Sequence, residues 1–347
     1  MVESNPPLLH DFGQLLLRHP GETCASCHRN ARDCVANEEM VILEECELPL
    51  IDLGGLRSKD EGERRACAAA ICKASSEWGF FQLVNHGISL QLLAEMRREQ
   101  VKLFNKPFER KATCGLLNNS YRWGNPTATS PKQFSWSEAF HIPLTKISEE
   151  ACYGEFDSLR KVMQEYAAAM QELANELAGI LVKNLGHQKE GVFGESCNGS
   201  TCFLRLNRYP PCPWSPEISG LVPHTDSDFL TILHQDDRVG GLQLLKDSKW
   251  VAVKPNHDAL IVNIGDLFQA WSNDVYKSAE HKVITNAKVE RYSIAYFLCP
   301  SYDSWIGSCK ELSSSIYRKF TFGEYRKQIQ QDVKMNGHKV GLPRFLR

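Results

Sequence analysis

The sequence predicts a mainly β core with helices packed around it. After about residue 200, short segments that often alternate between apolar and polar residues are separated by Gly, Pro, Asn and Asp. Many short strands at regular spacing are typical of a β-sandwich or barrel, and the jelly roll is one such form. Before residue 200, apolar residues instead recur at helical spacing, which predicts helices that cover the core.

The predicted elements follow one another along the whole chain. A short apolar strand is expected first, and the helix after it has acidic residues in its first turn and Gly79 as its stop. In order, the predicted segments before residue 200 are a strand at 47–53, a helix at 59–79, a strand and turn at 80–87, a helix at 88–105 and the longest helix at 156–186. The core strands are predicted at 202–210, 229–235, 241–245, 249–255, 259–266, 281–286 and 291–300, and the last helix at 322–334.

No linker rich in Pro, Gly or Ser divides the chain, so we expect one compact unit. Its predicted parts are a flexible N-terminal arm (1–45), a region of helices and strands packed on the core (46–198), the jelly-roll core (199–302), and a C-terminal helix and tail (303–347).

The composition excludes several classes of protein. The 347 residues include 40 Lys and Arg against 42 Asp and Glu, which gives no electrostatic reason to expect nucleic acid as a partner. No apolar run approaches the length of a membrane span, and the N-terminus lacks the basic and apolar regions of a secretory signal. The 13 cysteines have no framework spacing. We therefore expect a cytoplasmic protein with reduced thiols that does not bind membranes.

One cysteine cluster matches a cofactor motif. The stretch CASCH, with Cys24, Cys27 and His28, fits the pattern of c-type haem attachment, and Cys34 completes a possible zinc set. Haem attachment requires an exported chain, and a second ligand pair at zinc-finger spacing is missing. We therefore expect these residues to lie in the weakly structured arm.

The stretch GLVPHTDSDFLTILHQDD contains a candidate metal site. His224 and Asp226 are two positions apart on a predicted strand, so their side chains point to the same face. Three other histidines are candidates for a third ligand. His234 is too close to the first pair in the same strand, and His257 lies in a turn. His281 begins another strand. We select His281. Two histidines and one carboxylate with open positions are typical of non-haem Fe(II) oxygenases, whereas structural zinc prefers four protein ligands.

A second set of residues is suited to a carboxylate. Arg291 and Ser293 share one face of a predicted strand, and a guanidinium with a hydroxyl can bind a carboxylate end. Tyr209 adds a phenolic donor, and Asn207 lies on the same face as Tyr209. The alternative for Arg291 is a structural salt bridge.

These residues resemble the signature of the plant 2-oxoglutarate- and Fe(II)-dependent dioxygenases. The matching positions are His224-x-Asp226, His281, Arg291-x-Ser293 and Asn207-x-Tyr209, with the further stretches LPLIDL, EWGFFQLVNHGI, GGLQLL, LIVNIGDLFQAWSN and KSAEHKVITN. The resemblance implies a distorted jelly roll (a double-stranded β-helix) with Fe(II) as cofactor, and 2-oxoglutarate and dioxygen as co-substrates. It implies that 2-oxoglutarate chelates the iron through its keto-acid end and that its far carboxylate meets the arginine, serine and tyrosine of this set. Arg291 is thus predicted as a catalytic as well as a co-substrate-binding residue.

Three further stretches bear on the substrate. Residues 120–129, 135–141 and 202–213 are similar to those of the gibberellin 2-oxidases, specifically the subgroup that acts on 20-carbon gibberellins. This resemblance implies hydroxylation at carbon 2, which inactivates the hormone pathway. The predicted substrate-binding residues are Tyr121, Arg122, Trp136 and Phe140. The alternative is an ordinary core position for each aromatic, and an ion pair or a solvent-facing position for the arginine.

Other functions with the same fold remain open from the sequence. A gibberellin 20- or 3-oxidase or a flavonoid oxidase would keep the iron site and change only the lid segments, which are the three stretches named above, expected to lie over the mouth of the barrel. A non-catalytic hormone-binding protein of this fold is expected to lose one ligand or the arginine, and all of them are present. The position of the product's hydroxyl group separates the enzymes, and turnover of 2-oxoglutarate separates an enzyme from a binding protein.

Overall fold

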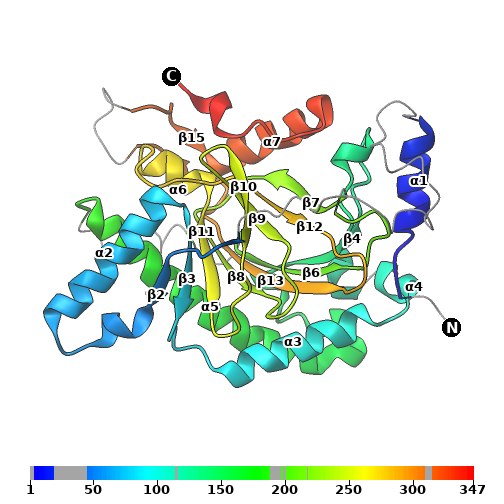
Figure 1. The fold of residues 1–347 in the computed structure, drawn as a ribbon, viewed down its shortest axis with the longest axis horizontal. Coiled ribbons are helices and arrows are strands. Elements are labelled where there is room, and N and C mark those ends of the chain that lie inside the picture. Colours follow the sequence, from blue (N-terminus) through cyan, green and yellow to red (C-terminus); the bar gives the residue numbers. More distant parts are fainter. Residues whose placement is uncertain are drawn as a thin grey trace.

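The computed structural model describes residues 4–18, 45–113, 116–187, 197, 201–216, 218–308 and 315–347. Two β-sheets form its centre, with helices around them (Figure 1). The larger sheet contains, in spatial order, β2 (Leu50–Asp52), β3 (Phe80–Val84), β11 (Leu260–Ile264), β8 (Leu230–Gln235), β13 (Arg291–Leu298), β6 (Phe203–Tyr209), β5 (Glu138–Pro143) and β4 (Tyr121–Trp123). The smaller sheet contains β1 (Glu45–Cys46), β10 (Lys249–Val253), β9 (Leu242–Lys246), β12 (His281–Ile284) and β7 (Ser219–His224). A two-stranded sheet of β14 (Trp305–Ile306) and β15 (Phe320–Thr321) lies outside this core.

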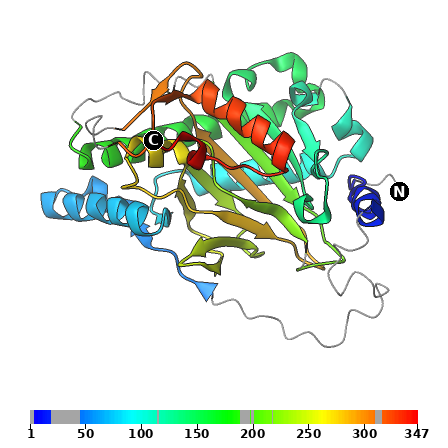
Figure 2. The ribbon, with the colours of Figure 1, turned by 90° about the horizontal axis from the view of Figure 1, so that it is seen from above.

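The helices cover the larger sheet and close the molecule. They are α1 (Leu8–Arg18), α2 (Glu61–Glu77), α3 (Leu90–Phe104), α4 (Phe108–Ala112), α5 (Asp157–Asn184), α6 (Asp266–Trp271) and α7 (Phe322–Asn336). Helix α5 packs against β8 and β13, with α3 beside it, and α7 crosses above the sheets (Figure 2). The buried face of α5 includes Met163, Met170 and Leu177, which recur every seven residues as expected for a helix that packs along a sheet. The arrangement is the predicted jelly roll with packed helices.

Helix α2 ends where the sequence predicts. Its last residue is Glu77, and Gly79 follows with a φ of +66°. A Cβ atom at this position would lie 2.2 Å from the backbone oxygen of Lys277. The glycine is therefore required both by the left-handed backbone and by the close approach of the chain before β12.

The N-terminal residues differ from the expected flexible arm. Residues Leu8, Phe12 and Leu15 are spaced for one helical face and are buried in a cluster with Phe134 and Trp136. The apolar face is only three turns long and lies among polar residues, so its pattern is weak in the sequence; its partners come from far along the chain. Cys24, Cys27, His28 and Cys34 lie outside the described residues.

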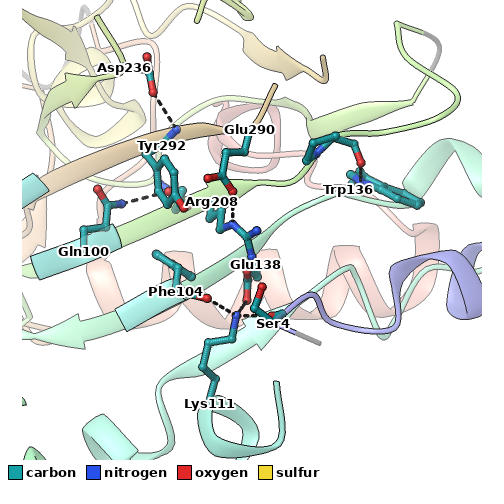
Figure 3. A network of polar contacts seen from close by, with 12 residues as sticks. Ser4, Gln100, Phe104, Lys111, Trp136, Glu138, Arg208, Asp236, Glu290 and Tyr292 are labelled. Carbon is teal, nitrogen blue, oxygen red and sulfur yellow. Dashed lines mark hydrogen bonds and ion pairs between the residues drawn. The ribbon is translucent and has the colours of Figure 1, made fainter. Parts of the chain in front are cut away.

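A second difference concerns the predicted lid. Residues within 120–143 form β4 and β5, which extend the larger sheet beyond β6. A buried ionic network joins this edge to α4 (Figure 3). In it, the Glu138 carboxylate lies 2.6 Å from Lys111 Nζ and 2.6 Å from Arg208 Nη1, and Arg208 Nε lies 2.8 Å from Glu290. The segment is thus part of the scaffold.

Candidate active site

Three potential metal ligands meet at the edge of the smaller sheet. His224 ends β7, Asp226 follows in the adjoining turn, and His281 begins β12, where it is the register partner of His224. The ligand atoms of these residues, the His–Asp–His trio, all lie within 4.8 Å of one another. His224 Nε2 is 3.7 Å and His281 Nε2 is 3.8 Å from Asp226 Oδ1.

Hydrogen bonds fix the orientation of both imidazoles. Nδ1 of His224 donates to the carbonyl of Val222 (2.8 Å), and Nδ1 of His281 donates to the carbonyl of Ala279 (3.1 Å). Because a carbonyl can only accept, the proton of each neutral ring is on Nδ1 and the lone pair is on Nε2. Such a bond on the second ring nitrogen is the usual support of a metal-bound histidine.

The carboxylate of Asp226 is oriented in the same way. Its Oδ2 accepts hydrogen bonds from Thr231 Oγ1 and Asn263 Nδ2, both at 2.7 Å. Thr231 and Asn263 are register partners on β8 and β11 of the larger sheet. The larger sheet therefore fixes Oδ2 of Asp226, and Oδ1 faces the imidazoles.

The electrostatics of the trio suit a divalent cation. Burial, followed by repulsion from His281, lowers the pKa of His224 to about 3. Burial by itself would raise the pKa of Asp226, but the two imidazoles and its hydrogen bonds outweigh burial and hold this pKa at about 2. Near neutral pH, His224 is thus neutral and Asp226 ionised, which are the protonation states that metal ligands require. Two nitrogens and one carboxylate oxygen on one side, with the other side toward a cavity, fit Fe(II).

A carboxylate-binding set lies nearby on the larger sheet. On β13 and β6, Arg291 is the register partner of Tyr209 and Ser293 is the partner of Asn207. The Arg291 guanidinium lies over the Tyr209 ring, 5.3 Å from its centroid, and Asn207 Nδ2 lies 3.3 Å from Ser293 Oγ. We call these four residues the carboxylate cradle.

The arginine of the cradle is fully buried and incompletely paired. Its Nη2 donates to Gln235 Oε1 (3.2 Å), whereas Nε and Nη1 have no hydrogen-bond partner among the described residues. No carboxylate of the described chain forms an ion pair with it, so the salt-bridge alternative has no support there. A buried cation with two free donors fits the far carboxylate of 2-oxoglutarate.

The trio and the cradle line one cavity. It lies between the two sheets and has a volume of about 310 Å³, which is within the range of small-molecule sites. Apolar side chains from both sheets, including Phe80, Leu233 and Val283, complete its inner wall. The ring of Phe80 packs edge-on against His281 at 5.2 Å between centroids.

The predicted substrate residues lie elsewhere. Tyr121 is buried with its hydroxyl on Glu138, Phe140 is buried in the main core, and Trp136 packs against α1 and donates to the carbonyl of Pro211 (3.3 Å). Arg122 donates to the carbonyls of Asn119 (2.7 Å) and Tyr121 (2.6 Å). Both tyrosine and arginine line a different cavity, of about 720 Å³, beside α1. The structure therefore does not bring these four residues to the cavity of the trio.

The other two histidines considered as ligands are also accounted for. His234 is half-buried and lies against Tyr166 of α5, on the opposite face of β8 from the cavity. His257 is exposed and pairs with Asp237 at 3.0 Å. Neither is near the trio.

Several residues of the cavity were missed by the sequence analysis. His141 of β5, Phe203 and Arg205 of β6, Phe297 of β13 and Arg326 of α7 all line it. Three of them belong to the stretches 135–141 and 202–213 that were selected for the substrate. The signal was the strand alternation itself: positions 203 and 205 are on the face of β6 that Asn207 and Tyr209 share. Nothing local in the sequence indicates Arg326.

Comparisons with known proteins agree with this geometry. Residues 200–300 match the 2OG-Fe(II) oxygenase superfamily, and residues 48–161 match the N-terminal region of the non-haem dioxygenases described from morphine synthesis. Gibberellin 2-beta-dioxygenase 6 of Oryza sativa subsp. japonica is 59% identical, with 87% of this chain and 86% of the relative covered. Gibberellin 2-beta-dioxygenase 8 of Arabidopsis thaliana is 55% identical, with 88% of each covered.

Solved structures show the same fold. The crystal structure of JOX2 in complex with 2OG, Fe and JA superposes with a TM-score of 0.74 at 31% identity and covers 95% of this chain and 97% of that one. The dioxygenase for auxin oxidation in rice has a TM-score of 0.71 at 29% identity and covers 87% of this chain and 100% of that one. The chain belongs to the 2OG-Fe(II) oxygenase superfamily and is a 2-oxoglutarate-dependent dioxygenase with Fe(II) as its cofactor.

Proposed function

We propose that the chain is a gibberellin 2-beta-dioxygenase that hydroxylates 20-carbon gibberellins at carbon 2 and thereby inactivates the hormone pathway. The observation that carries this proposal is its identity of 46–59% with four gibberellin 2-beta-dioxygenases of rice and Arabidopsis over most of each chain. The jasmonate-induced oxygenase 2 of Arabidopsis is more distant, at 37% identity.

In this proposal the His–Asp–His trio holds Fe(II), and the carboxylate cradle holds 2-oxoglutarate. The hydrogen-bonded imidazoles, the ionised Asp226 and the buried, partly unpaired Arg291 support these roles. When bound, iron and 2-oxoglutarate supply the oxidant that inserts one oxygen atom of dioxygen into a C–H bond, with release of succinate and carbon dioxide.

The task of the protein's own residues is then positioning. Arg291 and its neighbours fix the far end of 2-oxoglutarate, so its keto-acid end is directed toward the trio on the opposite sheet. Apolar residues of the inner wall exclude water from the reaction, and the substrate's carbon 2 must be held near the trio. No side chain is needed as a general acid or base.

We also propose that the enzyme acts in the cytoplasm. The cysteines whose surroundings are described are free thiols, most of them buried, as is usual in a reducing compartment. Within the described part of the chain, no helix has the length and apolar character that would let it cross a membrane.

The test is incubation of the purified protein with Fe(II), 2-oxoglutarate and either 19- or 20-carbon gibberellins. We expect succinate and a 2β-hydroxylated 20-carbon product, identified by mass spectrometry and by comparison with standards of known hydroxyl position. The Asp226→Ala variant serves as the control and should form neither product.

Oxidation at carbon 20 or carbon 3 would instead assign the protein to another gibberellin oxidase. Binding of gibberellin without any succinate would indicate a hormone-binding protein. Turnover of a flavonoid but of no gibberellin would also contradict the proposal.

A further inference from the structure

The inference concerns the cationic side chains that line the cavity between the sheets. There are four: Arg205, Arg291, Arg326 and Lys339. Arg291 belongs to the carboxylate cradle. Lys339 Nζ lies 2.7 Å from a carboxylate oxygen of Asp266 and also donates to the Thr225 carbonyl, so its charge is balanced within the protein.

The other two cations have no such balance. Among the described residues, neither Arg205 nor Arg326 forms an ion pair with a carboxylate; their guanidinium groups instead contact an amide oxygen and an aromatic ring. Arg205 Nε donates to Asn207 Oδ1 (2.8 Å), which fixes the stem of the side chain but leaves its charge unmatched. Arg326 lies over the ring of Phe322, 5.8 Å from its centroid, on the side of α7 that faces the cavity. Both are half-buried, where an unmatched charge favours an anionic ligand.

A wall of three stacked aromatic rings lies beside these arginines. The ring of His141 stacks on Phe203 with 4.0 Å between centroids, and Phe203 stacks on Phe297 at 4.3 Å with an interplanar angle of 11°. The three rings come from the adjacent strands β5, β6 and β13, and all of them line the cavity. Such a wall is suited to an apolar polycyclic molecule.

The imidazole ring of His141, which is part of this wall, is uncharged. Burial first, and then repulsion from Arg205, Arg326 and Arg122, lowers the pKa of His141 to about 4, so the imidazole is neutral near pH 7. Of these three arginines, Arg205 and Arg326 line the same cavity as His141, whereas Arg122 lines the other one.

We propose that Arg205 and Arg326 form an anionic subsite that binds a carboxylate of the substrate, while Phe203 and Phe297 contact its apolar rings. This inference rests on the proposed function. A 20-carbon gibberellin carries two carboxyl groups on an apolar ring system, so it offers both the charge and the surface that the subsite requires. The subsite replaces Arg122, which lies in the other cavity, as the anchor for the substrate.

The test compares Arg205→Gln and Arg326→Gln with the matched variant Lys327→Gln. Lys327 is adjacent to Arg326 on α7 but exposed, and it does not line the cavity. Each arginine variant should raise the KM for a 20-carbon gibberellin dicarboxylic acid about tenfold or more, as expected for the loss of a charge-assisted hydrogen bond at a half-buried site. The KM for 2-oxoglutarate should stay unchanged in Arg326→Gln, and Lys327→Gln should behave as the parent protein. Arg205 donates to Asn207 of the carboxylate cradle, so its variant is judged by the gibberellin KM alone.

A second measurement uses the dimethyl ester of the same gibberellin. The parent protein should bind the acid at least about 30-fold more tightly than the ester in anaerobic calorimetry, and this preference should shrink in Arg326→Gln. An unchanged preference in both arginine variants would overturn the subsite. An equal rise of both KM values in Arg326→Gln would also overturn it, because this arginine would then serve the co-substrate.

If the proposed function is wrong, the subsite can still be tested by a separate experiment. If the parent protein neither binds nor oxidises gibberellins, the subsite is tested with jasmonic and indole-3-acetic acids and their methyl esters by thermal shift in the presence of 2-oxoglutarate. An acid-over-ester preference that Arg326→Gln removes would still support an anionic subsite. No preference for any acid would reject it.

Discussion

Lys339 donates a hydrogen bond of 2.8 Å to the backbone carbonyl of Thr225, although the two residues are 114 positions apart in the sequence. Thr225 lies between His224 and Asp226, so this bond fixes the turn that carries two of the three potential ligands. Lys339 also donates to Ser227 Oγ (2.9 Å) and pairs with Asp266, whose carboxylate accepts from Thr225 Oγ1 (3.1 Å). The segment after α7 therefore clamps the metal-binding turn from outside the jelly roll.

We predict that Lys339→Met weakens iron binding on the order of tenfold, because supporting residues around a metal site typically contribute 10- to 100-fold to affinity. The measurement is a metal titration of the apo-protein, with thermal denaturation to establish that the variant is folded. Lys334→Met, at an exposed position of α7, is the matched control and should bind as the parent does. Equal affinities for the two variants would show that the clamp does not position the ligands.

Substitution of any member of the His–Asp–His trio should abolish turnover. His224→Ala, Asp226→Ala and His281→Ala each remove one of only three protein ligands, and the loss should appear in both metal content and succinate formation. His257→Ala is the control, since that imidazole is exposed on a distant turn. A folded trio variant with normal activity would mean that the substituted residue is not a ligand.

Arg291→Ala should raise the 2-oxoglutarate requirement far more than Ser293→Ala. Removal of one partner of a buried charge pair costs about 2–5 kcal/mol, whereas loss of one hydrogen bond costs about 1 kcal/mol. The KM for 2-oxoglutarate of each variant measures the difference. The opposite ranking would assign the co-substrate's carboxylate to another anchor.

Glu138→Gln should destabilise the fold strongly. The carboxylate is the shared partner of Lys111 and Arg208, whose side chains are 0% and 6% exposed; its loss leaves the buried Lys111 unmatched and Arg208 with only its pair to Glu290. Breaking a buried pair in this way costs about 3–5 kcal/mol, to be measured by urea denaturation. Glu61→Gln, which removes an exposed pair with Arg65, should have little effect. Similar stabilities of the two variants would contradict the structural role of the network in Figure 3.

His234 should make the protein less stable in mild acid. Burial, followed by the charge of Arg97, lowers its pKa from 6.5 to about 3 in the folded state. Below pH 6.5 the unfolded chain therefore binds a proton that the folded chain does not, so stability decreases as the pH falls from 6.5 toward 3. The slope from one such group is at most about 1.4 kcal/mol per pH unit.

The measurement for His234 is the free energy of unfolding at pH 7 and pH 5. His234→Leu should reduce its pH dependence. An identical pH dependence in the parent and in His234→Leu would mean that this histidine is protonated in the folded protein.

The core elements could be predicted because their signals are local. Alternating segments gave β6, β8, β9, β10, β11, β12 and β13 within a few residues of their bounds, and helical spacing gave α2, α3, α5 and α7. Helix α1 and strands β4 and β5 were missed, because they become stable only through partners elsewhere in the chain.

For the site, the sequence by itself determined which side chains share a face. The i and i+2 spacing of Asn207 with Tyr209 and of Arg291 with Ser293 is a property of any strand. For His224 and Asp226 the expected common strand is not found, because β7 ends at His224 and Asp226 lies in the turn that follows. Such spacing does not state which strands are neighbours. Only the tertiary structure placed β12 beside β7, and so His281 beside His224, and placed β13 beside β6, and so Arg291 beside Tyr209.

Only the tertiary structure decided which residues surround the substrate. His141, Phe203 and Phe297 form one wall because β5, β6 and β13 are adjacent, and Arg326 reaches the cavity because α7 crosses it. Arg122 was selected for its aromatic neighbours in sequence, but β4 is the outermost strand of the larger sheet and directs it elsewhere. The order of strands in a sheet is set when segments far apart in the sequence bury their apolar faces against one another. Local periodicity therefore does not reveal this order.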